Sequence, residues 1–521
     1  WQCIQLRGMK LALMTYDFDY KRGDIDDLEA FYVDIVSRVA GCASLAAVGD
    51  PAAKPPERSD GTLRMEAKAW RGRLRWTGRV KPQTWDEEAE PQHIGGLRSA
   101  RDSLSRLPNV REKGKIIGDA VKNLFRSSPE VLKALLEAVK LKVEDSSYLE
   151  GHVAKIVETI AMVVDCKDTR RGVELGAHCE VRPLLLGAWR AFVGDPDDQV
   201  EEWMMSGAPL GILATPLDRG IFPVYSDAEA ATHPSSLWSE PLNDGRRRRA
   251  DFDNDAAKEM DDMVKRRWVK KYKSKRSAKM AVKGKIVVSE LIVITKTKVK
   301  KDKQGRLTTS LKKRLILNLK KSGITAASTK TERPELPRIL DAVFAGLELL
   351  RRRRGIRGCW LRHVVLDFTH AFYNFPNRPD ERRFFCARLR RCIYMWLRAT
   401  QGSRGAPLIC GRALSLSMRL ACSCLDADEV DASTYVDDPL MTFVGTGEEQ
   451  DEALGVMVGC LLALGFDLAF AKAQDSNQQE QITWTSGVLI IDHERLAIHV
   501  EVKEDILQAL EADIDRSYEY N

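Results

Sequence analysis

Two adjacent aspartates set between strand-forming residues constrain the fold of this chain more than any other feature of its sequence. Residues 433–444 read Ser-Thr-Tyr-Val-Asp-Asp-Pro-Leu-Met-Thr-Phe-Val. The β-branched and aromatic residues on both sides predict a β-hairpin whose turn presents Asp437 and Asp438. Neighbouring carboxylates repel each other, which makes an unliganded pair a poor way to stabilise a turn. Mg²⁺ resolves the conflict because it takes oxygen ligands and commonly binds one or two carboxylates together with substrate phosphates. The plainer alternative is a solvent-exposed acidic turn.

A third carboxylate ends another predicted strand, 70 residues before the pair. The apolar run His363-Val-Val-Leu closes on Asp367, and a turn or short helix follows it. Beside the hairpin, Asp367 would complete a cluster of three carboxylates able to hold two Mg²⁺ ions, with Mn²⁺ as the alternative. Two metals suit in-line phosphoryl transfer, since one activates the attacking 3′-hydroxyl and the other neutralises the leaving pyrophosphate. Taken alone, an aspartate at the end of a strand is more often structural, and His370 receives no role.

The net charge of +7 conceals a strongly basic segment. Residues 264–321 hold 22 Lys or Arg against two acids, a net charge of +20, so the rest of the chain carries −13. Apolar residues within the segment fall in strand-like patches, 286–288 and 291–294. A basic run is usually just a solvated face, but this pattern favours a folded surface that neutralises phosphates. Polyanions are the expected partners.

The rest of the sequence divides by composition. Helical periodicity appears at 131–143, after the Ser128-Pro129 helix start, and at 153–164, so residues 1–205 are predicted to be mainly helical. Pro- and Gly-rich residues 206–250 read as a connector, and short strands alternate with helices beyond it. No internal repeat is present. The 11 cysteines contain no Cys-x-x-Cys pair, so we expect reduced thiols and neither a zinc site nor a disulfide framework.

Six segments spread over 286–500 resemble the motifs of reverse transcriptases, in that family's order. They are the fingers motif at 314–323, motif A at 367–372, motif B at 401–407 with a helix over 408–425, motif C at 435–438, motif D at 464–472 and the primer grip at 482–488. The resemblance implies an α+β fold: a right-hand polymerase palm, with an antiparallel sheet packed on helices, and fingers. The implied domains are the N-terminal region 1–205, the connector 206–250, fingers at 251–345, the palm at 346–500 and the start of a thumb at 501–521.

The resemblance also implies a role for individual residues. It gives the catalytic residues as Asp367, Asp437, Asp438 and Lys472, and the metal site as Asp367, Phe368, Asp437 and Asp438. It gives the nucleotide-binding residues as Arg314, Phe372, Gln401, Gly402 and Tyr435, and the primer grip as Trp484, Thr485 and Gly487.

These roles have physical sense. The planar fork of Arg314 suits phosphate oxygens, and Gly402 lets the backbone approach closely. Gln401 is expected to bond near the incoming base or sugar, and Phe372 to exclude a ribose 2′-hydroxyl. Lys472 could donate a proton to pyrophosphate, and the turn at 301–306 could close over the triphosphate. The plainer alternatives are a core phenylalanine and solvated charges.

The sequence departs from the family pattern at Pro439, Asn318, Thr400 and Ala406. The expected function is RNA-directed DNA synthesis by a retrotransposon-type element, from an RNA template, a DNA or RNA primer and dNTPs. Two alternatives stay open, an inactive nucleic-acid-binding relic and an RNA-directed RNA polymerase. No apolar run reaches 18 residues and no signal segment follows Trp1, so we expect an intracellular fragment of a polyprotein, of unknown oligomeric state.

Overall fold

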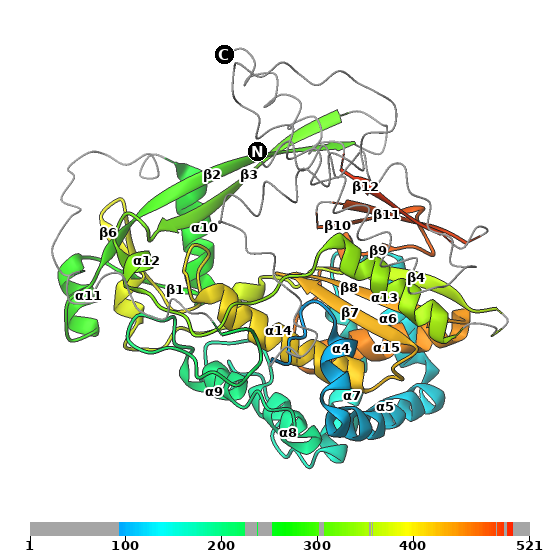
Figure 1. Ribbon diagram of the computed structural model, residues 1–521. Helices are drawn as coiled ribbons and strands as arrows, with labels where there is room; N and C mark the ends of the chain where they lie inside the picture. Colours follow the sequence, from blue (N-terminus) through cyan, green and yellow to red (C-terminus); the bar gives the residue numbers. More distant parts are fainter. Residues whose placement is uncertain are drawn as a thin grey trace, which may run out of the picture.

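The computed structural model describes residues 93–224, 237, 253–301, 307–353, 356, 358–485, 487–493 and 497–503, with the side chains of 296–312 and 497 excepted. Most of the predicted connector, the turn at 302–306 and the predicted thumb from 504 onward lie outside these residues, as do residues 1–92. The described part combines three sheets with many helices (Figure 1). The expected mixture of helices and mainly antiparallel sheets is therefore confirmed, while its division into palm and fingers stays a prediction. No described helix is long and apolar enough to cross a membrane.

A four-stranded antiparallel sheet of order β7-β8-β4-β9 carries the three predicted acids. Its strands are β7 (Val430–Tyr435), β8 (Asp438–Gly445), β4 (Trp360–Val365) and β9 (Gln474–Asp475). Both faces are buried: Met441 and Phe443 of β8 join the main core, whereas Leu440 and Val444 pack into a second core. Helices α14 (Ala406–Ser423) and α15 (Gly447–Ala463) cover the first face and α13 (Ile339–Arg352) the second. Period-two alternation along β8 thus fills two separate cores.

A five-stranded sheet of order β1-β6-β5-β2-β3 forms a second body beside this one. Its strands are β1 (Val269–Tyr272), β6 (Cys392–Trp396), β5 (Cys386–Leu389), β2 (Val288–Lys301) and β3 (Leu307–Asn318). The long β2–β3 hairpin is antiparallel in register from Glu290↔Asn318 to Lys301↔Leu307. Helices α10 (Asn254–Lys265) and α11 (Lys275–Ala281) contact this sheet, and α12 (Ile324–Ala327) follows β3 in the chain. Since β5 and β6 belong to this sheet, it crosses the expected boundary at residue 345.

A third sheet is the meander β10 (Gln481–Trp484), β11 (Gly487–Asp492) and β12 (Ala497–Val502). Its apolar face, with Ile482, Leu489 and Ile498, packs into the second core against α13. The meander therefore lies on the face of the central sheet opposite α14.

Six helices from the first part of the chain pack into the main core. They are α4 (Ala100–Ser105), α5 (Pro108–Ser127), α6 (Pro129–Lys140), α7 (Glu150–Val163), α8 (Pro183–Val193) and α9 (Gln199–Ser206), drawn in blue to teal in Figure 1. The predicted helix start at Pro129 is confirmed, although the Ser128 side chain makes no capping hydrogen bond. Helix α5 lies directly on the end of α14, because a Cβ at Gly118 would come within 1.9 Å of the Cys424 carbonyl oxygen. These helices share the main core with α14 and α15.

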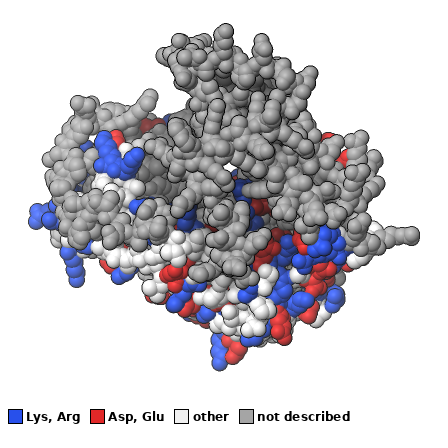
Figure 2. Space-filling model, in the orientation of Figure 1, with Lys and Arg blue, Asp and Glu red and all other residues white. Residues whose placement is uncertain are grey.

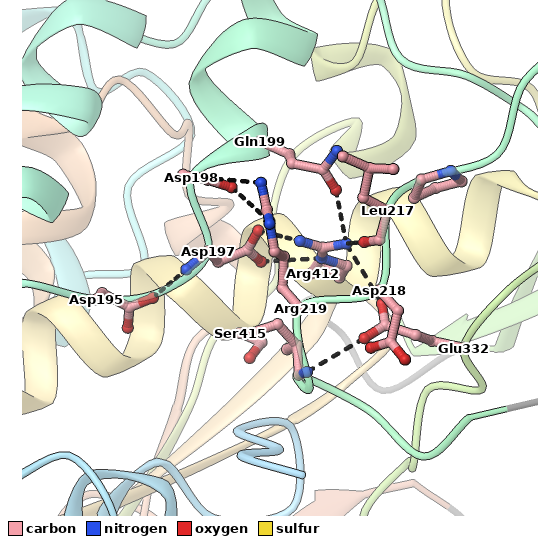
Figure 3. Close-up of polar contacts among 12 residues, drawn as sticks. Asp195, Asp197, Asp198, Gln199, Leu217, Asp218, Arg219, Glu332, Arg412 and Ser415 are labelled. Carbon is pink, nitrogen blue, oxygen red and sulfur yellow. Dashed lines mark hydrogen bonds and ion pairs between the residues drawn. The ribbon is translucent and has the colours of Figure 1, made fainter.

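Two fully buried arginines of α14, Arg412 and Arg419, bind the loop between α8 and α9. Figure 3 shows the contacts of Arg412. The Nε of Arg412 donates to Asp197 at 3.0 Å, and its Nη1 donates to Glu332 at 3.3 Å and to the Leu217 carbonyl at 2.7 Å. Arg419 makes a two-pronged bond to Asp195, at 2.7 and 2.9 Å. Removing one partner of a buried ion pair strands the other charge, at a cost of about 3–5 kcal/mol. The network fixes the loop between α8 and α9 against α14.

Candidate active site

The β7–β8 hairpin presents the predicted acid pair at its turn. Tyr435 pairs with Asp438, so Val436 and Asp437 form a two-residue turn. Val436 has a φ of 60°, a left-handed conformation that is rare for a β-branched residue. Backbone strain of this kind persists where the surroundings enforce it and is common at functional sites. Tyr435 is exposed at the end of β7.

Pro439 fits this hairpin without breaking it. It lies opposite Thr434, whose own N–H donates to the Leu97 carbonyl on the far side of β7. Thr434 and Pro439 therefore form a non-hydrogen-bonded pair of the antiparallel ladder, whose members exchange no backbone hydrogen bonds. The N–H that Pro439 lacks would not have bonded to β7. The Pro439 carbonyl accepts the Leu366 N–H at 3.1 Å. Proline therefore stands at a position of β8 where the ladder toward β7 needs no donor.

The main chain after β4 brings Asp367 to the turn. The N–H of Phe368 donates to the Asp437 carbonyl at 2.8 Å, and the Asp367 carbonyl accepts the Ala469 N–H at 2.8 Å. Phe368 itself is buried. Asp367 is thus held between the hairpin turn and the loop at 467–469, and residues 70 positions apart in sequence become neighbours.

The three carboxyl groups interact electrostatically. Burial, together with the charges of Asp437 and Asp367, raises the pKa of Asp438 to about 6. Burial and the charge of Asp367 also raise the pKa of Asp437. Burial and mutual repulsion thus both disfavour the ionised forms of Asp437 and Asp438.

Two cations act on the cluster. The Lys472 ammonium forms an ion pair with the Asp367 carboxylate, and Lys472 lies in the short 3-10 helix η6 (Phe470–Lys472). The charges of Lys472 and of Arg314, an exposed residue of β3, lower the pKa of Asp437 without offsetting its burial. Arg314 therefore brings the five-stranded sheet within electrostatic reach of the acids.

The donor set suits Mg²⁺, although no group of three His, Cys, Asp or Glu side chains in the described residues is arranged as a complete metal site. Hard divalent cations prefer carboxylate oxygens, and Asp367, Asp437 and Asp438 supply them from one turn and one strand end. Their incompletely compensated charge is what a divalent cation would neutralise. The residues present fit the metal.

Three of the predicted nucleotide-binding residues lie in a short 3-10 helix after Asp367 and in the turn before α14. Phe372 lies half-buried in the 3-10 helix η4 (Ala371–Asn374) and packs against the main core. Gln401 is half-buried in the turn before α14. Gly402 has a φ of 96°, and a Cβ there would lie 3.0 Å from the Leu317 carbonyl oxygen of β3. Gly402 therefore permits a close approach between this turn and the strand that carries Arg314.

The predicted primer-grip residues lie directly beneath the acid hairpin. The buried Trp484 indole donates from Nε1 to the Asp438 carbonyl at 3.1 Å. Thr485 has a φ of 52° and its carbonyl accepts from Lys503, while Gly487 packs against Ile339 of α13. Trp484 thus supports the main chain of a predicted metal ligand, and its contact with a primer stays a prediction.

Sequence reasoning assigned no chemistry to the segment that covers the edge of β7. Ser99 donates to the Asp431 carboxylate at 2.7 Å, the Arg101 N–H donates to the same group, and Ser433 donates to the Arg98 carbonyl. Residues 97–101 thereby cover the outer edge of the β7–β8 hairpin. The one local signal for this role was a lone acid, Asp431, at the start of an apolar strand.

Comparisons with known proteins are sparse. No family model matches the sequence, and no curated protein matches it. Among solved structures, the chain is similar to the foamy viral protease-reverse transcriptase in complex with dsDNA, at a TM-score of 0.30 and 14% identity over 48% of this chain and 41% of that chain. It is also similar to the same protein in complex with an RNA/DNA hybrid, at 0.29 and 14% over 47% and 26%. The native Prototype Foamy Virus protein gives 0.27 and 14% over 44% and 24%. The chain spans less than half the length of each, and likenesses at these TM-scores carry no argument about its function.

Proposed function

We propose that this chain is an RNA-directed DNA polymerase that adds dNTPs to a primer 3′-hydroxyl. One observation carries the proposal: Asp437 and Asp438, whose pKa values are raised, converge with Asp367 beside Lys472 and within electrostatic reach of Arg314. Acids held together at raised pKa in a half-buried site are costly unless a cationic ligand uses them. In-line phosphoryl transfer requires this combination of carboxylates, cations and phosphate-binding arginine.

The metal would be held by the carboxylates of Asp367 and Asp437, with Asp438 beside them and the main chain of Phe368 adjacent. When bound, Mg²⁺ would neutralise charge on the phosphates and favour the ionised 3′-hydroxyl. The chain's own residues would do the remaining work. Arg314 would bind the triphosphate through its planar fork, and Lys472 would hold a proton near the leaving pyrophosphate.

The sugar and base would be selected by the residues around the turn before α14. Phe372, half-buried five positions after Asp367, would block a ribose 2′-hydroxyl. Gln401 and Gly402 would line the nucleotide beside β3, with Tyr435 exposed at the hairpin end. These contacts are proposals that follow from position, and each has its own test.

The nucleic-acid partner would lie along the basic segment 264–321. In its described part, exposed Lys and Arg residues follow one another over β1 and α11, including Lys270, Lys271, Lys273, Lys275 and Arg276. Figure 2 shows blue side chains over α11 at the left edge, whereas the surface over α4–α7 mixes both signs of charge. Contacts of this kind neutralise phosphates and are weakly dependent on sequence.

A primer-extension assay tests the function. The full chain should extend a primer on an RNA template with dNTPs and Mg²⁺, and the activity should disappear when EDTA removes the metal. Extension with rNTPs alone would indicate an RNA polymerase instead. Template binding without any extension would indicate an inactive nucleic-acid-binding protein, and the proposal would then be wrong.

A further inference from the structure

A second concentration of charge lies where four segments of the chain meet. Strands β1 and β6 pair through Val269↔Trp396, and the Leu397 N–H donates to the Trp268 carbonyl at 2.8 Å. This pairing brings the residues around β1 next to Arg398, which follows Leu397. The resulting basic cluster also receives a residue of the 3-10 helix η5 (Arg382–Phe384) and one from the loop between α7 and α8. It consists of His178, Arg267, Lys270, Arg382 and Arg398.

Arg398 is a buried arginine without an adequate counterion. Its side chain is about as buried as those of Arg412 and Arg419. Its Nη1 donates to the Tyr373 carbonyl at 2.6 Å, but its Nε has no hydrogen-bond partner among the described residues. The nearest acid, Glu180, lies 3.7 Å from Nη2 and has a side chain that is 39% exposed. Burial lowers the pKa of Arg398 to about 10, which marks a guanidinium whose charge is poorly compensated.

The other members of the basic cluster add positive charge around this arginine. Arg382 donates from Nε to the Asn377 carbonyl at 2.9 Å, and the Lys270 ammonium lies over the Tyr272 ring at 5.6 Å. Within the part of the chain that the structure describes, His178, Arg267, Lys270 and Arg382 form no ion pair. Burial and the charges of the four cations all lower the pKa of His178. Four permanent cations therefore lie around His178, and among the described residues only Arg398 has an acid, Glu180, beside it.

We propose that the basic cluster of His178, Arg267, Lys270, Arg382 and Arg398 binds a phosphate group. The ligand chemistry is a tetrahedral dianion or diester, presented either by a nucleic-acid backbone or by free phosphate. Arginine forks suit phosphate oxygens, and the exposed Arg267 and Lys270 supply the entry side while Arg398 supplies a fixed charge behind them. The inference does not depend on polymerase activity. It also reaches the candidate site, because Arg398 holds the carbonyl of Tyr373, the residue after Phe372.

The imidazole of His178 reports on occupancy directly. Histidine side-chain ¹⁵N NMR on the full chain, with His178→Gln to assign the signal, gives the pKa of His178. Inorganic phosphate and, separately, a ten-nucleotide single-stranded RNA are the probes. A bound anion should raise the pKa of His178 by at least about 0.5, because it offsets the surrounding cations.

Matched variants localise the effect. Lys270→Gln should abolish the rise in the pKa of His178, whereas Lys140→Gln, an exposed change in α6 outside the basic segment, should leave it intact. A rise with inorganic phosphate alone assigns a small free anion to the cluster. A rise with the RNA, with or without phosphate, assigns the nucleic-acid backbone. If neither probe changes the pKa of His178, or if Lys270→Gln behaves like Lys140→Gln, the proposal is overturned.

Discussion

Two groups of acids in this protein are neutralised to very different degrees. Asp195 and Asp197 are fully buried beside α14. Asp195 is hydrogen-bonded to Arg419, and Asp197 is hydrogen-bonded to Arg412, as Figure 3 shows for Arg412. Asp437 and Asp438 are less buried, and in the described residues no arginine is bonded to either of them. The buried acids beside α14 thus have permanent arginine partners, whereas the acids of the candidate site have a single lysine, Lys472, bonded to Asp367 among the described residues.

The difference indicates where ligands are needed. An acid that only stabilises the fold gains most from a permanent partner, whereas an acid that binds a metal must stay available for it. Lys472, an exposed and flexible cation, is a partner that can be displaced from Asp367. The two buried arginines differ in the same way. Arg412 is hydrogen-bonded to the buried Asp197, whereas the acid nearest to Arg398, Glu180, lies 3.7 Å away and is partly exposed.

The largest expected effect concerns the structural acids. Asp195→Asn should lower the free energy of unfolding by about 3–5 kcal/mol, because it leaves the buried Arg419 charge without its carboxylate. Urea denaturation at pH 7.5 measures the change, and Asp198→Asn, in the same loop with a half-exposed ion pair to Arg219, should cost less than about 1 kcal/mol. Equal losses in the free energy of unfolding would show that the buried pair of Asp195 and Arg419 stabilises the fold no more than an exposed ion pair does.

The next prediction concerns the candidate site, at Phe372. If its ring excludes a 2′-hydroxyl, Phe372→Val should raise ribonucleotide use on the order of a thousandfold, equivalent to about 4 kcal/mol, while dNTP use falls much less. Single-nucleotide extension with paired dNTP and rNTP measures the ratio. A wild type that already accepts both sugars, or a variant that loses both equally, would show that Phe372 serves the core alone.

The smallest effect is a pH dependence of stability. The pKa of Asp438 is about 6 in the folded protein against an ordinary 3.8, so protonation favours the folded state. This stabilisation is complete below about pH 4 and is lost as the pH rises through 6. Because Asp438 is partly solvated, we expect the loss to be only about 1 kcal/mol.

Comparison with Asp438→Asn isolates this contribution. Asp431 also has a pKa of about 6, but it is present in both proteins and cancels in the difference. The variant should be more stable than the wild type at pH 7.5 and should lack this part of the pH dependence. Mg²⁺ should stabilise the wild type at that pH more than the variant. Identical pH profiles for the two proteins would show that Asp438 carries no uncompensated charge.

Local patterns in the sequence predicted the strands and the helix around the candidate site because these elements are short and strongly patterned. The strand pair around Asp437 and Asp438 is confirmed, as is a strand that ends just before Asp367. The helix predicted over 408–425 is observed at Ala406–Ser423. Period-two and period-3.6 alternation encode such elements directly.

Long-range pairings escaped prediction for a physical reason. Arg412 and Asp197 are 215 positions apart, and neither lies in a pattern that names its partner. The same holds for Asp431 and Ser99, which bind the N-terminal segment to the edge of β7. The membership of β5 and β6 in the five-stranded sheet is likewise set by tertiary packing, since their sequences would suit any buried strand.

Asp437→Asn tests the central claim most directly, because it separates function from stability in one variant. Primer extension should fall at least about a hundredfold, since a metal ligand is lost, while template binding is retained. The free energy of unfolding measured on the same sample should stay level or rise, in contrast to the loss expected for Asp195→Asn. Retention of extension, or a loss of stability as large as that of Asp195→Asn, would contradict the assignment of the under-neutralised acids to a metal-binding active site.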